Sequence, residues 1–140
     1  MPAGEIALSD SADGLTPTLL EGFFVGWPAP PSADRHLEIL RASTYVSVAW
    51  AGDEVAGFIA AIGDGIFAAY ISLLEVKPPF QGRGVGTALT RRMLERLSHC
   101  YMIDLICDPD LLAFYERLGM SRYTGAIVRN PGALASPTSG

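Results

Sequence analysis

A glycine-rich segment, Gln81-Gly82-Arg83-Gly84-Val85-Gly86, is the feature that most constrains how this chain can fold. It lies between a strand-like run that ends at Pro78-Pro79 and a helical pattern that extends to Ser98. Helix interiors disfavour glycine, so three glycines in five positions indicate a special role for this first turn. Free N–H groups and a partial positive charge at a helix N-terminus favour an anion. The segment therefore predicts a pyrophosphate cradle between a strand and a helix.

Spacing excludes two other phosphate-binding motifs. A P-loop requires a Gly-Lys dipeptide, and the chain has none. A dinucleotide fingerprint requires glycine or alanine at its sixth position. Thr87 stands there when the count begins at Gly82, and Leu89 when it begins at Gly84. The remaining alternative is a glycine-rich turn that begins a helix and binds nothing.

Hydrophobic periodicity predicts the other elements around this segment. Helices are expected at Thr16–Phe24, Ser32–Arg41, Gln81–Ser98 and Asp110–Leu118. Strands are expected at Glu5–Leu8, Tyr45–Trp50, Val55–Ile62, Ile66–Val76 and Tyr101–Cys107, with a last short pair at Ser121–Tyr123 and Ala126–Arg129. An antiparallel meander that leads into a strand–helix–strand crossover predicts an α/β fold with a mixed sheet.

The composition indicates one globular domain. Hydrophobic residues make up 49% of the 140 residues and charged residues 18%, which favours a packed core. We expect a single domain over residues 1–130 and a flexible tail over residues 131–140. No apolar run approaches the roughly 18 residues that span a bilayer, so no membrane segment is expected. The net charge of −5 argues against nucleic acid as a partner.

A local basic cluster stands out in this acidic chain. Its members are Lys77, Arg83, Arg91, Arg92 and Arg96. Such a cluster indicates either one site for an anionic ligand or the solvated face of a helix, and the sequence leaves both interpretations open.

Cysteines, histidines and the N-terminus carry few functional signals. Cys100 and Cys107 lie on either side of one short predicted strand, so we expect both to stay unpaired. Neither forms a Cys-x-x-Cys motif or lies beside a histidine cluster, which argues against a metal site. His36 and His99 are interpreted as surface residues. The first nine residues show no signal-peptide pattern, and two free thiols fit a cytoplasmic location.

Three segments together resemble one protein family. Gln81–Gly86 resembles the Gln-x-x-Gly-x-Gly signature with which the GCN5-related N-acetyltransferases (GNAT) bind acetyl-CoA. Leu73–Pro78 is similar to that family's splayed central strand, and Phe114–Met120 to its Phe-Tyr-Glu-Lys-Leu-Gly-Phe segment. Phe23–Pro28 with Cys107–Asp110 is similar to a small bacterial and plastid-type subgroup that includes plant serotonin N-acetyltransferase-like proteins. The resemblance implies a largely antiparallel mixed sheet, flanked by helices, with a splayed central strand pair.

The resemblance also implies acetyl-CoA as the cofactor and direct attack of an amine on its thioester. Cofactor contacts are then expected from Leu74, Val76, Gln81, Gly82, Arg83, Gly84, Val85, Gly86, Thr87, Asp108, Phe114, Tyr115 and Arg117. Asp108 stands where family members often carry an asparagine that contacts the cofactor. Backbone N–H groups near Val76 are expected to stabilise the developing oxyanion.

Tyr115 and Glu75 are the candidate catalytic residues. Tyr115 matches the family's helix tyrosine, and a phenol can donate a proton to the leaving sulfur. Glu75 is a carboxylate inside an apolar strand, which raises its pKa and suits a general base acting through water. The alternatives are a core aromatic residue for Tyr115 and a purely structural carboxylate for Glu75.

The acceptor is the least determined part of the reaction. Phe23, Trp27 and Tyr70 are candidates for an aromatic acceptor pocket, although aromatic residues at such positions also form cores. The leading hypothesis is a small primary amine. The alternatives are a protein N-terminus or lysine, and a non-catalytic acyl-CoA sensor. The apolar composition also permits a homodimer.

Overall fold

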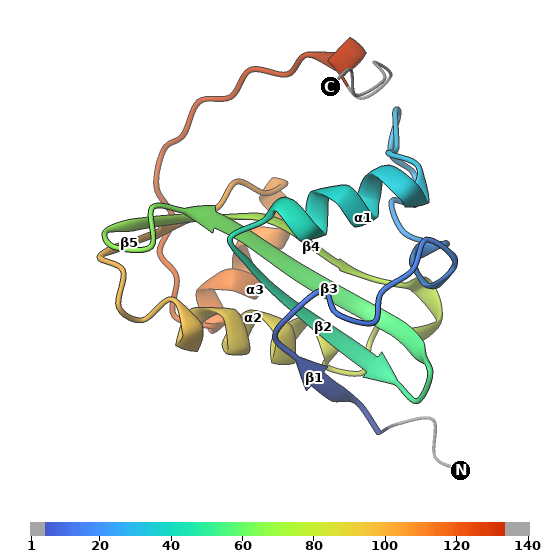
Figure 1. Cartoon of the computed structure of the whole chain (residues 1–140). Coiled ribbons are helices and arrows are strands. Elements are labelled where there is room, and N and C mark those ends of the chain that lie inside the picture. Colours follow the sequence, from blue (N-terminus) through green and yellow to red (C-terminus); the bar gives the residue numbers. More distant parts are fainter. Residues whose placement is uncertain (1–4, 134–140) are drawn as a thin grey trace.

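The computed structural model describes residues 5–133 and contains one five-stranded sheet. Its strands are β1 (Ala7–Ser9), β2 (Tyr45–Ala51), β3 (Glu54–Gly63), β4 (Ala68–Val76) and β5 (Met102–Asp104). They lie side by side in sequence order, antiparallel from β1 to β4, and β5 runs parallel to β4 (Figure 1). This arrangement confirms the predicted mixed, largely antiparallel α/β sheet.

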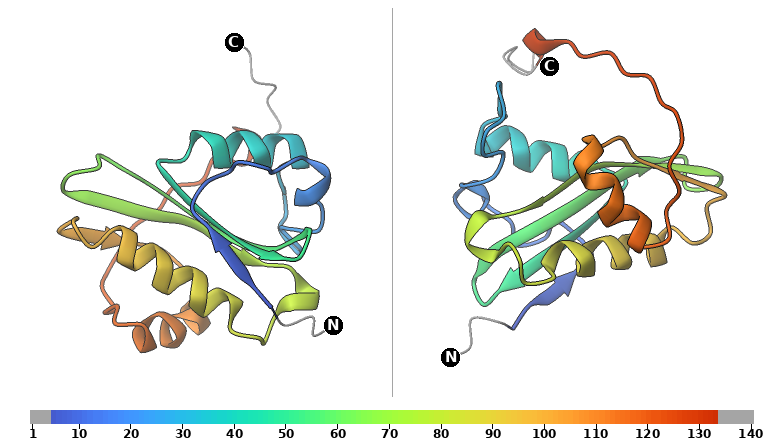
Figure 2. Two further views of the ribbon diagram at one scale, coloured as in Figure 1. Left: turned by 60° about the horizontal axis from the view of Figure 1, so that its bottom comes forward. Right: turned by 180° about the vertical axis from the view of Figure 1, so that it is seen from behind.

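Helices cover both faces of the sheet. α1 (Ala33–Ala42) lies on one face, whereas α2 (Val85–Arg96) and α3 (Leu112–Arg117) lie on the other (Figure 2). Short 3-10 turns complete the chain: η1 (Thr18–Leu20), η2 (Pro78–Phe80), η3 (Pro109–Leu111) and η4 (Pro131–Ala133). No helix within residues 5–133 is long and apolar enough to cross a membrane.

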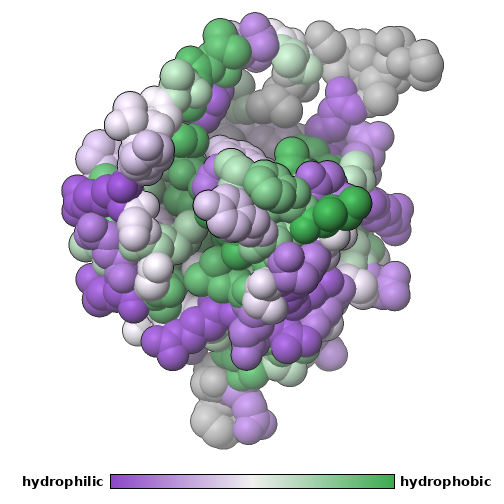
Figure 3. Space-filling model, turned by 90° about the vertical axis from the view of Figure 1, so that its left-hand side faces the viewer, coloured by the Kyte–Doolittle hydropathy of each residue, from purple (hydrophilic) through white to green (hydrophobic). Residues whose placement is uncertain are grey.

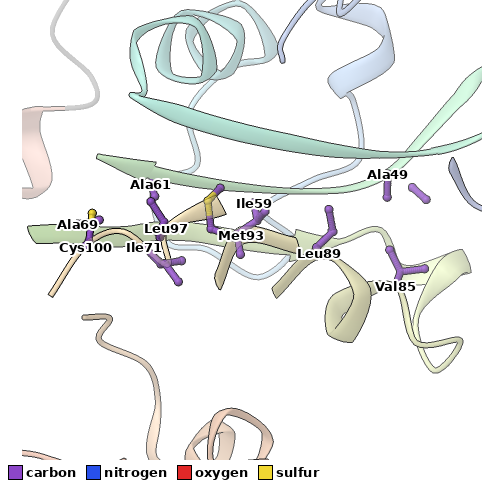
Figure 4. Packing of buried hydrophobic residues seen from close by; sticks show 11 residues of the cluster. Ala49, Ile59, Ala61, Ala69, Ile71, Val85, Leu89, Met93, Leu97 and Cys100 are labelled. Carbon is purple, nitrogen blue, oxygen red and sulfur yellow. The ribbon is translucent and has the colours of Figure 1, made fainter. Parts of the chain in front are cut away.

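Two hydrophobic clusters hold these layers together, one on each face of the sheet. The cluster on the α2 face includes a stripe of helix residues at four-residue spacing, Val85, Leu89, Met93 and Leu97, which packs on Ile59 and Ile71 (Figure 4). The cluster on the α1 face includes Leu20, Phe24, Leu37, Leu40 and Phe58. β3 is therefore buried on both sides from Val55 to Ala61, which agrees with the absence of polar side chains from that stretch.

The predicted helix over Thr16–Phe24 is wrong. Only the short turn η1 forms, because Glu21 is extended and Gly22 and Phe24 have φ angles of 94° and 61°. A right-handed helix cannot continue through positive φ. The chain instead turns toward β4, where the Phe24 N–H donates to Glu75. A tertiary contact has therefore overridden the local helical pattern.

The predicted strand pair at Ser121–Tyr123 and Ala126–Arg129 does not form. Residues 121–129 belong to no strand or helix of the described chain, and all are exposed. This segment runs past the end of the sheet near β5 and then arches away from it (Figures 1 and 2). The predicted flexible tail begins with η4, and residues 134–140 lie outside the described part.

Some boundaries also differ from the prediction. The helix expected from Gln81 begins at Val85, because Gly84 has a φ of 81°. The strand expected over Tyr101–Cys107 is limited to Met102–Asp104. The other helices and strands lie within a few residues of their predicted positions.

β4 and β5 pair at one end only. Ala68–Tyr70 lie opposite Met102–Asp104, and β4 then continues to Val76 without a partner on that side. This divergence confirms the predicted splayed strand pair. A cavity can form here because neither strand fills the space between them.

β4 also contains an irregularity that its sequence does not reveal. Ala60 lies opposite Leu73, whereas the next residue of β3, Ala61, lies opposite Ile71. Ser72 is therefore an extra residue in β4, which is the pattern of a β-bulge. The bulge reverses the side-chain alternation, so Ile71 and Leu74 both pack on the α2 face.

Candidate active site

A cavity of about 610 Å³ opens where β4 and β5 separate. One wall is β4 from Tyr70 to Val76, and another is the segment Leu105–Asp108 that follows β5. Tyr115 on α3, the loop over residues 22–27 and Gln81 also line it. The cavity thus brings together residues that lie far apart in the sequence.

The free edge of β4 supplies backbone donors to this cavity. The Lys77 N–H donates to the Ala56 carbonyl on β3 at 2.8 Å. Backbone groups alternate sides along a strand, so Leu74 and Val76 direct their N–H and C=O groups toward the cavity. The Val76 carbonyl accepts a hydrogen bond from Gln81 Nε2 at 3.0 Å, which agrees with this direction. This edge can therefore donate to an oxygen atom in the cavity.

The loop over Gln81–Gly84 leaves its backbone accessible at the start of α2. Gly82 and Gly84 have φ angles of 77° and 81°, which glycine adopts without strain. No heavy atom lies within 4 Å of a Cβ built on either residue, so the space beside them is open. The first N–H groups of a helix have no partner inside the helix. The loop and the helix end can together hold a phosphate group.

Gly86, in the first turn of α2, lies beside α3 and β4. A Cβ at this position would lie 3.7 Å from Phe114 Cζ and 3.8 Å from a methyl group of Val76. Phe114 in turn packs edge-on against Tyr115, with ring centroids 4.9 Å apart. Through Phe114, the first turn of α2 therefore helps to position Tyr115 beside the cavity.

Tyr115 is buried, and it lines the cavity. Burial, with a smaller contribution from Cys107, raises the pKa of its phenol to about 12. The phenol therefore stays protonated near neutral pH. No residue in the described part of the chain makes a hydrogen bond with its hydroxyl, so the O–H can donate into the cavity.

Glu75 is half-buried and lines the same cavity. Its Oε1 accepts a hydrogen bond from the Phe24 N–H at 2.8 Å. Burial raises the pKa of its carboxyl group, and this hydrogen bond opposes the rise in part. Leu73, two residues earlier in the strand, packs on the α1 face, so Glu75 also reaches the cavity from that face.

The three aromatic residues predicted to bind the acceptor divide into two groups. Trp27 and Tyr70 line the cavity. Phe23 does not line it, because its ring packs edge-on against His36 and Phe58 in the α1-side cluster. The aromatic wall therefore consists of two of the three predicted residues.

The predicted cofactor residues also divide into two groups. Leu74, Val76, Gln81, Asp108 and Tyr115 line the cavity. The others lie on the loop, on the first turn of α2 or on α3: Gly82, Arg83, Gly84, Val85, Gly86, Thr87, Phe114 and Arg117. Val85 is buried in the α2-side cluster, so its side chain serves packing.

Most of the basic cluster serves the fold. Lys77 Nζ donates to the Leu19 carbonyl at 3.1 Å, and Arg96 donates to the Val46 carbonyl at 2.8 Å. Arg92 makes a bidentate ion pair with Asp10, which lowers the pKa of that carboxyl to about 2. The interpretation of a single anion site formed by all five residues is therefore wrong.

Three further polar groups differ in their roles. His36 is buried among Phe23, Phe24 and Phe58, so its interpretation as a surface residue is wrong. Asp64 caps the turn before β4, accepting N–H donors from residues 66–68. Both cysteines are free thiols, and no group of metal-binding side chains gathers within residues 5–133.

Part of the cavity wall comes from residues that the sequence did not indicate. Leu105, Ile106 and Cys107 line the cavity because the chain diverges after β5, although they were predicted to continue that strand. Ile127 and Arg129 also line it from the C-terminal segment. No local pattern marks these residues, since the position of each depends on strands distant in the sequence.

The family model of the Acetyltransferase (GNAT) family matches residues 12–120. The chain belongs to this family. The match includes the splayed strand, the glycine-rich loop and α3, and so covers most of the cavity described above.

Several relatives of this chain carry N-acetyltransferase in their names. Serotonin N-acetyltransferase 2, chloroplastic, of Oryza sativa subsp. japonica is 29% identical over 91% of this chain and 67% of its own length. GCN5-related N-acetyltransferase 1, chloroplastic, of Arabidopsis thaliana is 31% identical over 80% of this chain and 59% of its own. The uncharacterized N-acetyltransferase ycf52 of Pyropia yezoensis is 29% identical over 68% of this chain. This chain spans 58% of that relative's length.

Solved GNAT structures extend the similarity across the chain. A crystal structure from Deinococcus radiodurans R1 has a TM-score of 0.92 at 38% identity and covers 99% of this chain and 98% of its own. A GNAT-family acetyltransferase from Streptococcus pneumoniae TIGR4 has a TM-score of 0.74 at 25% identity, covering 90% of this chain and 98% of its own. Both support the family assignment.

Proposed function

We propose that this protein is an N-acetyltransferase that moves the acetyl group of acetyl-CoA to a primary amine of a small molecule. The observation that carries the proposal is the composition of one cavity. It contains a strand edge with N–H donors, a phenol that can donate a proton and a half-buried carboxylate that can accept one. A glycine loop suited to a pyrophosphate lies beside it. Together these groups can stabilise the oxyanion and move the two protons in acyl transfer to an amine.

The described residues fit acetyl-CoA. The open space beside Gly82 and Gly84 and the first N–H groups of α2 suit its pyrophosphate. The free edge of β4 from Leu74 to Val76 suits its extended amide-bearing arm, because such an arm can pair with a strand edge. Asp108 lies at the cavity wall, but a carboxylate cannot supply the N–H donor of an asparagine there.

The catalytic groups act from opposite faces of the sheet. When bound, acetyl-CoA supplies an activated acyl group and a thiolate leaving group. Leu74 and Val76 donate N–H groups toward the cavity and stabilise negative charge on an acyl oxygen. Glu75 accepts a proton from the incoming ammonium group, through a water molecule, on the α1 face. The Tyr115 O–H donates a proton to the leaving sulfur on the α3 side. Each proton therefore has its own route.

The volume and the lining of the cavity favour a small acceptor. Its volume of about 610 Å³ lies within the range of small-molecule sites, roughly 300–1,000 Å³. Trp27 and Tyr70 give it an aromatic wall, and the relative from Oryza sativa is named for an aromatic amine. We infer that an arylalkylamine is the preferred acceptor. A cytoplasmic location stays a prediction.

A panel of amines tests this proposal. Release of the CoA thiol would be measured with serotonin, phenethylamine, an alkylamine, a polyamine and lysine-bearing peptides. We expect turnover that is fastest with the arylalkylamines. Faster turnover with the peptides would favour a protein acceptor, and acetyl-CoA binding without any turnover would favour a sensor. Either result would contradict the proposal.

Trp27→Ala provides a matched comparison within the same panel. Removal of the indole ring from the cavity wall should lower kcat/KM for arylalkylamines by about 10-fold, which corresponds to the loss of one aromatic contact. The alkylamine should be nearly unaffected, because it does not contact the ring. Equal losses for both amines would place Trp27 outside the acceptor pocket.

A further inference from the structure

The side chain of Lys77 holds the chain segment that leads to Trp27. Its Nζ donates to the Leu19 carbonyl at 3.1 Å and lies 5.2 Å from the centroid of the Phe23 ring. Its Cδ and Cε lie 3.8 Å from a Cβ built on Gly22, so the side chain also passes close to that part of the backbone. We name residues 19–27 the acceptor segment. Lys77, which directly follows β4, therefore reaches the first half of this segment.

The Lys77 ammonium group depends on this segment for its partners. Burial lowers the pKa of the group, and the charges of Glu54 and Glu21 oppose this effect in part. No carboxylate in the described part of the chain forms an ion pair with it. A cation that leaves water costs free energy unless other groups replace its hydration. The Leu19 carbonyl and the Phe23 ring supply that replacement, since each attracts a cation.

The second half of the acceptor segment forms part of the cavity wall. The Phe24 N–H donates to Glu75 Oε1 at 2.8 Å. Trp27 packs edge-on against Phe24, with ring centroids 4.8 Å apart. Glu75 and Trp27 both line the cavity. The end of β4 therefore holds the segment at two points, through Glu75 in its second half and through Lys77 in its first half.

The backbone of the acceptor segment needs such restraints. The φ angle is positive at Gly22, Phe24 and Gly26, with values of 94°, 61° and 83°. Glycine adopts positive φ freely, whereas the same conformation is unfavourable for phenylalanine. An unfavourable conformation persists only where the surrounding structure enforces it. The buried Phe24 ring supplies one restraint and Glu75 another, and Lys77 restrains the residues just before them.

We propose that Lys77 is a positioning residue for the acceptor half of the reaction. Its ammonium group fixes the first half of the acceptor segment, and thereby keeps Trp27 at the cavity wall and the Phe24 N–H on Glu75. Lys77 itself does not line the cavity, so it acts only through the segment. The effect on turnover rests on the proposed function, whereas the position of the segment can be measured without it.

Hydrogen exchange of the Phe24 amide tests the position of the segment. Lys77→Met keeps a side chain of similar length and removes the charge and the N–H donors. We expect the Phe24 amide to exchange about 10-fold faster or more in this variant, because the segment opens more often. The amides of Phe58 and Ile59 on β3 should exchange at their natural rates, since they lie in the buried core.

Two exchange results would overturn the proposal. One is a natural exchange rate of the Phe24 amide in Lys77→Met. The other is acceleration of the Phe24 and β3 amides by the same factor, which would show that Lys77 adds only to global stability. Lys77→Gln takes the place of Lys77→Met if the methionine variant does not fold. Failure of both variants to fold would assign Lys77 to the fold as a whole and would also overturn the proposal.

Steady-state kinetics of the same variant test the consequence for the reaction. We expect the KM for an arylalkylamine to rise about 10-fold and the KM for acetyl-CoA to stay the same, because only Trp27 and its segment lose their fixed place. Lys77→Arg should restore much of the natural KM, since a guanidinium group also donates to a carbonyl and lies over a ring.

Two kinetic results would contradict the proposal. They are equal rises in both KM values, and a loss in Lys77→Arg as large as that in Lys77→Met. If no amine is turned over at all, the proposed function fails, and exchange of the Phe24 amide still decides the role of Lys77.

Arg96→Met is the matched control. Arg96 makes the same two kinds of contact as Lys77, since it donates to the Val46 carbonyl at 2.8 Å and lies 5.6 Å from the centroid of the Tyr45 ring. It belongs to α2, on the other face of the sheet, and does not line the cavity.

The control also lies near the opposite end of β4 from Lys77. A Cβ built on Gly65, in the turn before β4, would lie 4.0 Å from the Tyr45 hydroxyl oxygen, whereas Lys77 follows the last residue of that strand. The turn is at the end of the sheet that faces the viewer in Figure 3, and its apolar residues Ile66 and Phe67 are 80% and 51% exposed. The control therefore disturbs packing at a site distant from the acceptor segment.

Arg96→Met should leave both the exchange of the Phe24 amide and the KM for the arylalkylamine at their natural values. The reason is that its contacts do not involve the acceptor segment. If Arg96→Met caused the same changes as Lys77→Met, a general loss of stability would explain both variants, and the proposal would be overturned.

Discussion

Tyr115 and Glu75 reach one cavity from opposite faces of the sheet, and their environments shift both pKa values upward. The shifts have different consequences for the two residues. A raised pKa keeps the phenol protonated and able to donate. It also brings the carboxyl group closer to the pH at which a base is most effective. The same physical cause, burial, thus moves the pKa of Glu75 toward the range of a useful base and keeps the Tyr115 hydroxyl in its protonated form.

Tyr115→Phe tests the acid at the residue scale. Loss of the hydroxyl should lower kcat by about 100-fold or more, the usual contribution of a positioned proton donor. The KM for acetyl-CoA should change little, because the ring and its contact with Phe114 remain. Steady-state kinetics would measure both, with thermal unfolding as the check on folding. Full activity of the variant across the pH range would show that Tyr115 is not the acid.

Glu75→Gln tests the base. The amide oxygen can still accept the Phe24 N–H, so the loop over residues 22–27 should keep its position. A base must be deprotonated, so activity of the natural protein should rise with pH through the raised pKa of Glu75. The variant should lose about 100-fold in kcat/KM, and this rise should disappear from its pH profile. If the rise persisted, the base would be another group.

Two elements, the glycine loop and α2, form the proposed pyrophosphate site together. The loop keeps its backbone accessible only because Gly82 and Gly84 adopt positive φ. α2 then supplies its first N–H groups at a fixed place, since its apolar stripe is packed against the sheet. The rigidity of the helix and the openness of the loop are both required for such a site.

Gly84→Val tests this site at the scale of the element. The side chain would occupy the open space beside the loop, and β-branched residues disfavour positive φ. Acetyl-CoA affinity should fall by about 100-fold, which corresponds to the loss of one or two hydrogen bonds to a charged group. Calorimetry would measure the affinity. Tight binding by this variant would contradict the cradle.

Gly52→Val is the control for backbone strain. Gly52 has a φ of 63° in the turn between β2 and β3, also with no heavy atom within 4 Å of a built Cβ. A valine at this position would meet similar backbone strain, but Gly52 belongs neither to the glycine loop nor to the cavity wall. The affinity of the Gly52→Val variant for acetyl-CoA should match that of the natural protein.

At the scale of the whole molecule, one acidic residue connects three parts of the fold. Asp10 follows β1, accepts a hydrogen bond from Ser47 on β2 at 2.9 Å and pairs with Arg92 on α2. Arg96 adds a further charge at 3.8 Å. These contacts attach the N-terminal strand to the layer that carries the glycine loop, so they serve stability and not ligand binding.

Asp10→Asn should lower the free energy of unfolding by about 1–2 kcal/mol near neutral pH, once the shift to a pKa of about 2 is discounted for partial exposure. The folded pKa lies below the unfolded one. The stabilisation is therefore present above about pH 4 and is lost as the pH falls toward 2. Urea denaturation at several pH values would measure it. A difference between the variant and the natural protein that stayed constant down to the lowest pH would contradict this account.

The sequence by itself determined the segments with strong local signals. Glycines just before an apolar helical stripe predicted the loop and α2. Hydrophobic periodicity, interrupted by a few turn residues, predicted β2 and β3. Tyr115 could be named because its segment matches a family pattern, and Glu75 because it is a carboxylate inside an apolar strand. In each case the signal lies within about ten residues of the feature, where local sterics and periodicity dominate.

Only the tertiary structure decided where these segments meet. The Phe24 N–H donates a hydrogen bond to Glu75, and the chain turns there instead of forming the predicted helix. The extra residue Ser72 changes which side chains of β4 face each hydrophobic cluster. The predicted strands after Ser121 remain unpaired, because a strand forms only where a neighbouring edge can accept its hydrogen bonds. The glycine loop is a local property of the chain. The cavity beside it depends on the divergence of β4 from β5, because pairing between strands is a contact over long sequence separation.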